Sequence, residues 1–188
     1  MATLYWHNKN GTNNANDRTN YTTNIGGTTV ATVGVMDSDT LLFNGSGTGH
    51  NDNWTLSTNL TVGSADFTGY TGIATNTYIF KVILAGIKLA TGMTISDPGG
   101  EWNMGVAGTF TSNGKTIYEF DVSLATGTVT LADNLVCTLL HNSSAGGKTI
   151  SGAGTITATT FLDDTVGFKN ININNNIVLT GHTTFNLI

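Results

Sequence analysis

Residues 108–117 read GTFTSNGKTI, residues 127–134 read GTVTLADN, and residues 146–157 read GGKTISGAGTIT. The phrase Gly-Thr-apolar-Thr starts at Gly108, Gly127 and Gly154, and the phrase Gly-Lys-Thr-Ile starts at Gly114 and Gly147. The intervals between these starts are unequal, which indicates corner loops of varying length. A short apolar β segment repeated about every 20–30 residues is typical of a β-solenoid, in which neighbouring coils bury each other's apolar faces.

The composition favours many short strands over helices. The chain contains 35 Thr, 22 Asn and 24 Gly, and only 10% of its residues are charged. Thr is β-branched and fits a pleated surface, whereas Asn and Gly supply turns. From residue 35 onward, runs of alternating apolar residues end in Gly, Asn, Asp or Ser, as strands and turns do. We therefore predict an all-β protein, a short right-handed parallel β-helix or related β-solenoid of about five to seven coils.

The alternation also predicts the core. In a strand buried on one face, every second side chain points inward. The expected core residues of the repeated region are Ile117, Val129, Leu131, Leu135, Ile150, Ile156, Ile171, Ile173 and Leu179, with Phe161 and Ile177 on the same faces. The Thr and Asn residues between them are expected to stack as ladders on neighbouring coils.

The segment 1–34 differs from the rest of the chain, because it is rich in Asn and poor in apolar residues. It predicts a loop-rich cap or arm rather than core, which divides the chain into a cap (1–34) and a solenoid (35–188). The cap could cover one solenoid end or reach a neighbouring chain through Leu4, Tyr5, Trp6 and Tyr21.

The three tryptophans, Trp6, Trp54 and Trp102, are evenly spaced along the chain. Their flanking residues (YWHN, NWTL and EWNM) do not align with one another. We interpret the spacing as coincidence, with a stack of Trp on one face of the solenoid as the alternative.

The charge pattern argues against nucleic acid as a partner. The net charge is −5, and the seven basic residues lie singly, so no cluster is present to neutralise phosphates. No apolar run reaches the length of about 18 residues typical of a membrane span. The N-terminus MATLYWHNKN lacks the basic and apolar regions of a signal peptide. We expect synthesis in a cytoplasm and no membrane association.

The segment GTFTSNGKTIYEFDVSLATGTVTLADNLVCT (108–138) resembles a widespread type of parallel β-helix protein found among virion proteins of tailed bacteriophages and among bacterial surface proteins. In those proteins, phrases like NGKTI followed by GTVTLADNL build successive coils. The earlier DSDTLLFNG and TLSTNLTVGSADFTGYTG are similar to the entry of such solenoids, so the likeness covers roughly residues 35–188. It implies the fold, and it leaves open whether the role is that of a fibre, spike, adhesin or capsid decoration.

Within this class we expect a non-enzymatic virion protein, a capsid decoration (cement) protein that stabilises the head. The expected partners are copies of the same chain and the major capsid protein or another virion protein. One alternative is a tail-fibre or spike adhesin that binds a host surface glycan. Another is a polysaccharide lyase or hydrolase.

Carboxylate pairs are the candidates for catalysis, because solenoids that cleave polysaccharides carry carboxylates on one face with Lys, Arg or His nearby. Asp37 and Asp39 alternate, so they would share a strand face, a usable acid–base geometry. However, no basic residue lies in the same segment. Asp163 and Asp164 are adjacent and predict a turn. We therefore assign no catalytic residue.

The sequence also predicts no metal and no cofactor. The four histidines lie in Asn- and Gly-rich turns without zinc spacing: His7, His50, His141 and His182. The Gly-rich GSGTGHND (45–52) lacks the Lys and the strand–helix setting of a phosphate loop. Cys137, in NLVCTLL, is expected inside a strand as a buried structural residue.

The C-terminus, HTTFNLI, runs apolar to its last residue, and its candidate interface residues are Phe185, Leu187 and Ile188. An uncovered solenoid end exposes unpaired backbone groups and apolar side chains. We therefore predict a homo-oligomer in which the C-terminal segment contacts another chain. The likeness to fibre and decoration proteins favours a homotrimer.

Overall fold

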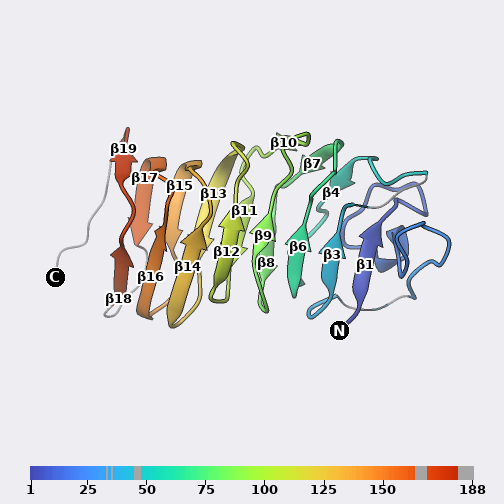
Figure 1. Ribbon diagram of the computed structural model, residues 1–188, viewed down its shortest axis with the longest axis horizontal. Helices are drawn as coiled ribbons and strands as arrows, with labels where there is room; N and C mark the ends of the chain where they lie inside the picture. Colours follow the sequence, from blue (N-terminus) through green and yellow to red (C-terminus); the bar gives the residue numbers. More distant parts are fainter. Residues whose placement is uncertain (33, 35, 45–47, 164–168, 182–188) are drawn as a thin grey trace.

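The computed structural model describes residues 1–32, 34, 36–44, 48–163 and 169–181, with the backbone alone at 163, 169–172 and 179. These residues are nearly all β, and stacked parallel strands form a β-solenoid of about six turns, which confirms the predicted fold. The coils follow one another along the long axis of the molecule (Figure 1). A short 3₁₀ turn spans Arg18–Asn20.

The largest sheet has nine strands and runs the length of the solenoid. In spatial order these are β18 (Lys169–Ile173), β16 (Gly146–Gly152), β14 (Gly127–Leu131), β12 (Gly108–Thr111), β9 (Ile87–Lys88), β6 (Ser64–Asp66), β3 (Thr40–Leu42), β1 (Thr3–Trp6) and β2 (Tyr21–Thr22). Among the described strand pairs, only β1 and β2 run antiparallel.

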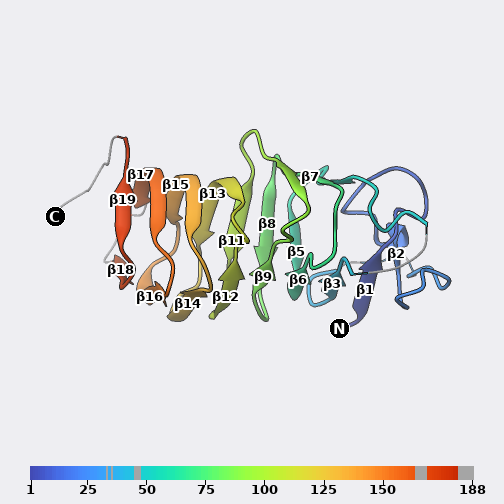
Figure 2. The same cartoon turned by 45° about the horizontal axis from the view of Figure 1, so that its top comes forward.

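Two further sheets complete the coils. The seven-stranded sheet contains β19 (Ile177–Leu179), β17 (Ile156–Asp163), β15 (Leu135–Asn142), β13 (Thr116–Val122), β11 (Glu101–Met104), β8 (Ile79–Val82) and β5 (Leu60–Val62). The three-stranded sheet contains β10 (Thr94–Ser96), β7 (Ile73–Thr75) and β4 (Trp54–Thr55). The rotated view in Figure 2 shows the strands of the seven-stranded sheet, from β5 to β19, and Figure 1 shows those of the three-stranded sheet.

The register shows the true repeat. On the nine-stranded sheet, Phe110 pairs with Ile87 on one side and with Leu131 on the other. On the seven-stranded sheet, Trp102 pairs with Phe80 and Phe120. Partners on neighbouring strands are thus separated along the chain by one coil of about 20 residues, which is the structural unit of a solenoid.

The repeated phrases lie out of register with one another. Gly108 pairs with Val129 instead of Gly127. The first Gly-Lys-Thr-Ile phrase enters β13 of the seven-stranded sheet, whereas the second lies in β16 of the nine-stranded sheet. Burial of the apolar side chains sets strand register, and a glycine offers no side chain to bury.

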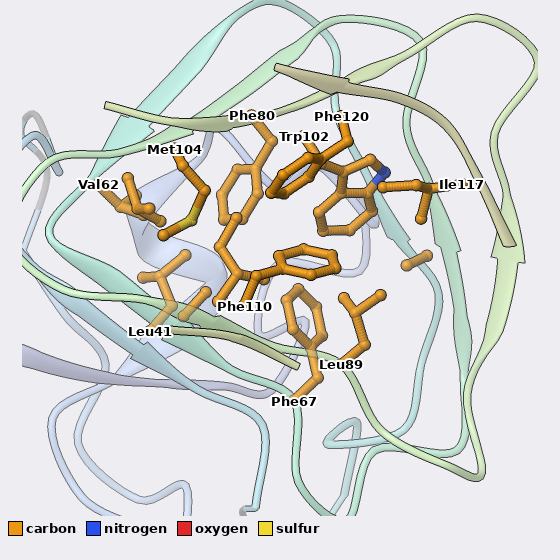
Figure 3. Close-up of a cluster of buried hydrophobic side chains, with 14 of the residues drawn as sticks. Leu41, Val62, Phe67, Phe80, Leu89, Trp102, Met104, Phe110, Ile117 and Phe120 are labelled. Atoms are coloured by element: carbon orange, nitrogen blue, oxygen red, sulfur yellow. The ribbon is translucent and has the colours of Figure 1, made fainter. Parts of the chain in front are cut away.

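Large aromatic side chains fill the first coils (Figure 3). Phe43 and Phe67 stack with ring centroids 3.9 Å apart, and Phe80 lies between Trp54 and Trp102 at 5.2 and 5.5 Å. Trp6, Trp54 and Trp102 come from three different sheets and are completely buried. The tryptophans therefore do not form a stack on one face.

Most of the predicted core is confirmed. Buried residues of the predicted set are Ile117, Val129, Leu131, Leu135, Ile150, Ile156 and Phe161, and Ile173 packs against them partly buried. The side chains of Ile171 and Leu179 lie outside the described ones. Ile177, expected on the inward face only, is 39% exposed. It is in register with buried Ile156, but β19 is the last described strand of its sheet.

The residues 1–34 contribute to the core, which the prediction of a separate cap or arm did not include. β1 pairs in parallel with β3, and its Leu4 and Trp6 are completely buried, as is Tyr21 of β2. Each aromatic ring buries about 150–250 Å², so a few of them build a core in an Asn-rich segment. The boundary between a cap and a solenoid stays a prediction.

Candidate functional site

A row of polar residues crosses the outer side of the seven-stranded sheet. Glu101 and Asn103 lie on β11, Glu119 and Asp121 on β13, and His141 on β15. Glu101 is in register with Glu119, Asn103 with Asp121, and Asp121 with His141. Core residues alternate with them along each strand, so the row faces outward. We call these five residues the polar ladder.

Hydrogen bonds join the rungs of the polar ladder. Asn103 Nδ2 donates to Glu101 Oε1 at 2.5 Å and to Asp121 Oδ2 at 2.6 Å. His141 Nδ1 lies 2.5 Å from Glu119 Oε1 and 3.9 Å from Asp121 Oδ1. Each of these contacts except the one within β11 crosses from one coil to the next.

Two serines complete the hydrogen bonding of the buried members. Ser123 Oγ donates to Asn103 Oδ1 at 2.5 Å. Asp121, which is 1% exposed, accepts from Ser143 Oγ at 2.5 Å and from the Ser143 backbone N–H at 3.1 Å. A buried carboxylate costs several kcal/mol when its oxygens are unpaired, so these partners are needed for the coil to close.

The acidity of Glu101 is altered by its place in the polar ladder. Burial raises its pKa to about 7, opposed by the hydrogen bond from Asn103 and reinforced by the negative charges of Asp121 and Glu119. Glu101 therefore exchanges a proton near neutral pH. Desolvation and the Glu119 charge also raise the pKa of Cys137 to about 12. Cys137 is 4% exposed, which confirms the predicted buried cysteine.

The polar ladder combines carboxylates with a histidine on one face, the residue types that polysaccharide-cleaving solenoids use. Low exposure distinguishes it from an open site: the Glu119 and His141 side chains are only 14% and 12% exposed, and the named oxygens of Asp121 are bonded within the chain. The arrangement ties three coils together and includes Glu101, whose pKa is raised to about 7.

Sequence reasoning missed the polar ladder, because its members are separated by a whole coil. Glu101 and Asn103 precede Glu119 and Asp121 by the same interval along the chain. A search for acidic residues at the coil spacing would have found E-x-N and E-x-D in register. Acidic residues that are adjacent or alternate along the chain do not reveal this register, because its members lie one coil apart.

The outer side of the nine-stranded sheet carries uncharged hydroxyl ladders, as predicted. Thr109, Thr130 and Ser151 follow one another in register on β12, β14 and β16. At the start of the solenoid, Ser64 Oγ donates to Thr40 Oγ1 at 3.2 Å across β6 and β3. We call this surface the hydroxyl face.

Two shallow grooves adjoin on the hydroxyl face and share exposed Lys88. The first, of about 280 Å³, is lined by residues that include Asp66, Thr109 and Thr111. The second, of about 420 Å³, extends past the end of the sheet to Asn113. Hydroxyl, carboxylate, ammonium and amide groups meet here, which are the groups that hydrogen-bond to sugars.

The Asp37/Asp39 pair does not share a strand face. Asp37 is exposed in a turn, whereas Asp39 is buried beside the start of β3. Asp39 accepts hydrogen bonds from Arg18 Nε at 3.0 Å and from the Ala2 backbone N–H at 2.6 Å. The missing basic partner comes from a different segment, earlier in the chain, and the pair anchors the N-terminal segment.

The other predicted residues are dispersed. Asp163 ends β17 in register with Asn142, while Asp164, His182 and the interface candidates Phe185, Leu187 and Ile188 lie outside the described residues. His7 is buried with its ring centroid 6.5 Å from that of His50, and burial lowers its pKa. Among the side chains that the structure describes, no group of three His, Cys, Asp or Glu residues is placed to hold a metal ion.

Comparison of the chain with protein-family models, with curated proteins and with solved structures found no match. Over the described part of the chain, no helix has the length and apolar character needed to cross a membrane.

Proposed function

We propose that the protein is a non-enzymatic structural component of a virion and that it decorates the capsid head as a cement protein. The resemblance of residues 108–138 to phage β-helix proteins supports the class. The polar ladder supports a structural role, because its buried groups bind neighbouring coils of the same chain. Stacked coils create an extended surface, which suits contact with several subunits of a lattice.

The single observation that carries the proposal is the hydroxyl face. Thr109 and Thr130 are exposed on it in register, with half-buried Ser151 next to them. This row of hydroxyl side chains, unlike the neighbouring part of the face with Lys88 and Asp66, packs against another protein without burying unpaired charge, which is the costly step in forming an interface. It therefore fits contact with a capsid surface.

The proposed assembly is a homotrimer that binds the major capsid protein or another virion protein. Ile177 and Val178 are 39% and 49% exposed on β19, and the apolar segment with Phe185, Leu187 and Ile188 follows them in sequence. Exposed apolar strand edges favour association. The purified protein should have the mass of a trimer in solution, and removal of residues 185–188 should yield monomers. A trimer that survives the truncation contradicts the role of this segment.

The test of capsid decoration uses charge on the hydroxyl face. Purified protein should co-sediment with capsids that lack it, and Thr130→Glu should reduce this binding by at least about tenfold through like-charge and desolvation costs. Thr138→Glu is the matched control, because Thr138 is also exposed but lies on the seven-stranded sheet. Location of the labelled chain on the tail, or equal binding by both variants, contradicts the proposal.

A glycan-binding adhesin is the second candidate, and the grooves around Lys88 favour it. In this case the protein should bind a host surface glycan, and Lys88→Ala and Asp66→Ala should each weaken binding. Lys115→Ala serves as the control, because its amine is engaged by the Thr91 carbonyl. A glycan array without a signal dependent on Lys88 or Asp66 rules this candidate out.

A further inference from the structure

A histidine is enclosed beneath a turn at the N-terminal end of the solenoid. His7 directly follows β1 and is 1% exposed. Its ring lies against the backbone of Gly27, because a Cβ on this glycine would be 2.5 Å from both Nδ1 and Cε1 of the imidazole. Gly27 has a φ of 70°, so glycine supplies both the turn and the room for the ring. The turn 24–28 therefore packs directly on the imidazole.

The hydrogen bonds of Asn24 hold this turn together from within. Asn24 Oδ1 accepts from the backbone N–H groups of Thr28 at 3.1 Å and Thr29 at 2.9 Å, and its Nδ2 donates to Thr28 Oγ1 at 2.7 Å. The Gly27 N–H donates to the Asn24 carbonyl at 3.1 Å. None of these bonds ties the turn to the imidazole, so the turn can separate from the ring with its own hydrogen bonds intact.

The imidazole of His7 is held in its neutral form. Its Nδ1 lies 3.4 Å from the Thr48 carbonyl oxygen, which can only accept, so this nitrogen carries the proton of the neutral ring. Nε2 is buried without a hydrogen-bond partner among the described residues. Protonation of Nε2 would bury a charge with one N–H unbonded, which is costly. Burial lowers the pKa of His7, opposed by the Thr48 and Ile25 carbonyls and reinforced by the positive charges of Lys9 and His50.

The described segments around the ring bring no acid into contact with it. The turn 24–28 contains no ionisable residue. Lys9 follows in the chain, and the ring centroid of His50 is 6.5 Å away, so both repel an imidazolium when they are protonated. The acid of the neighbouring turn, Asp52, accepts from Asn8 Nδ2 at 2.9 Å. The other charged residues of the N-terminal segment are bonded elsewhere: Asp17 to Thr19, and Arg18 to Asp39.

We propose that acidification opens the turn 24–28 while the rest of the solenoid stays closed. An imidazolium at position 7 needs water or an anion at Nε2, and separation of the turn from the ring admits it. The turn yields because the strand beneath it is fixed. β1 pairs in parallel with β3, and Trp6 packs edge to face against Tyr21 with ring centroids 5.2 Å apart.

The base of the turn supplies the hinge. Thr22 and Val30 form an antiparallel bridge there, and the Ala31 N–H donates to the Tyr21 carbonyl at 2.9 Å. These contacts lie outside the turn 24–28 and join it to the buried end of β2. They are therefore retained when the tip of the turn moves away from the imidazole.

The pH effect of His7 is opposite in sign to that of Glu101. Because burial lowers the pKa of His7, the closed turn keeps its full stability above the ordinary pKa of 6.5 and loses stability as the pH falls below it. Glu101, whose pKa is raised to about 7, stabilises the fold as the pH falls through that value. An opening in acid at the N-terminal end is thus separable from the titration of Glu101.

The test follows the contact between ring and turn by NMR. The nuclear Overhauser effect between the His7 Cε1 proton and the Gly27 Cα protons should weaken severalfold from about pH 7.5 to about pH 5. Its midpoint, and that of the Gly27 amide shift, should coincide with the titration of the His7 ring, because the protonated ring belongs to the open form. Contacts between β13 and β15 should keep their intensity over the same range.

Two variants assign the effect to one histidine. His7→Asn keeps an N–H donor for the Thr48 carbonyl but cannot be protonated, so the Gly27 amide shift should no longer change with pH. His50→Asn is the matched control and should still open. Opening that persists in His7→Asn, or that disappears in His50→Asn, overturns the proposal. If His7→Asn does not fold, the native protein decides: a His7 ring that titrates with its Gly27 contact unchanged, or that stays neutral until the whole protein unfolds in acid, also overturns it.

Discussion

The first coils and the later coils fill the same solenoid in different ways. In residues 1–104 the strands are short, such as β4 and β8, and the core is dominated by aromatic rings in contact with one another. In residues 127–163 the strands are longer, and the core is aliphatic, with Leu131, Leu140 and Ile150 completely or almost completely buried.

The difference shows two routes to a closed coil. Within the described residues, the three-stranded sheet occurs only in the first half, where short strands make a third side. In the second half the longer strands β13, β15 and β17 take the place of this third side. Long strands supply more backbone hydrogen bonds between coils, whereas in the half with short strands the large aromatic rings bury more apolar area per residue. The repeated phrases belong to the second half.

The largest expected effect tests the aromatic route. Trp102→Ala should lower the free energy of unfolding by about 3–5 kcal/mol, because it removes a ring packed against Phe80 and Phe67. Ile150→Val in the aliphatic half should cost only about 0.5–1.5 kcal/mol. Urea unfolding measures both variants. Equal losses of unfolding free energy in the two variants would contradict the distinction between an aromatic and an aliphatic core.

The glycines of the repeated phrases should differ in how strongly their replacement by alanine lowers the stability of the later coils. A Cβ on Gly154 would lie 1.9 Å from the Asp133 carbonyl oxygen in the preceding coil, whereas a Cβ on Gly147 would meet nothing within 4 Å. Gly154→Ala should therefore destabilise by about 1–3 kcal/mol, and Gly147→Ala should be close to neutral. Thermal unfolding of the two variants side by side checks this expectation. An equal loss of stability in both variants would contradict the role of the close contact at Gly154. It would indicate instead that the substitutions act on the unfolded state.

The polar ladder joins the two halves at β11 and β13, and its acid should make stability depend on pH. The folded-state pKa of Glu101, about 7, lies above its ordinary 4.5. Its contribution is therefore fully present below pH 4.5 and is lost as pH rises through about 7. Glu101 is half-buried, so solvent screening reduces the effect to about 1–2 kcal/mol.

Glu101→Gln should remove this dependence. Unfolding free energies measured from mildly acidic to mildly basic pH should fall with pH in the native protein and fall less steeply in the variant. Parallel curves for the two proteins would show that Glu101 does not titrate in this range.

The last effect concerns the anchor of the N-terminal segment. Asp39→Asn keeps a hydrogen-bond acceptor for the Ala2 N–H but leaves the largely buried Arg18 without its counter-charge, so it should cost about 3 kcal/mol, the lower end for a buried ion pair. Neither Asp39→Asn nor Asp164→Asn should affect biological activity apart from stability. Turnover of a polysaccharide that disappears in either variant would contradict the non-enzymatic proposal.

The fold could be predicted from the sequence, whereas the polar ladder could not, and the reason is physical. Alternation along one strand is local, so the buried state of Val129, Leu135 and Ile156 could be read directly. The polar ladder depends on the register of β11, β13 and β15, which is set by burial of the core residues between them. The Arg18–Asp39 pair and the burial of Lys148 depend in the same way on which coils meet.

The sequence by itself determined that this chain is all-β, low in charge and built from repeated coils, because strand alternation and turn residues act over a few neighbouring positions. Only the tertiary structure decided that the repeated phrases lie out of register, that the three tryptophans are buried on three different sheets, and that Lys148 is buried beside Asn142. These contacts join residues whose places depend on the length of every corner between them, and corner lengths follow from packing of the whole coil.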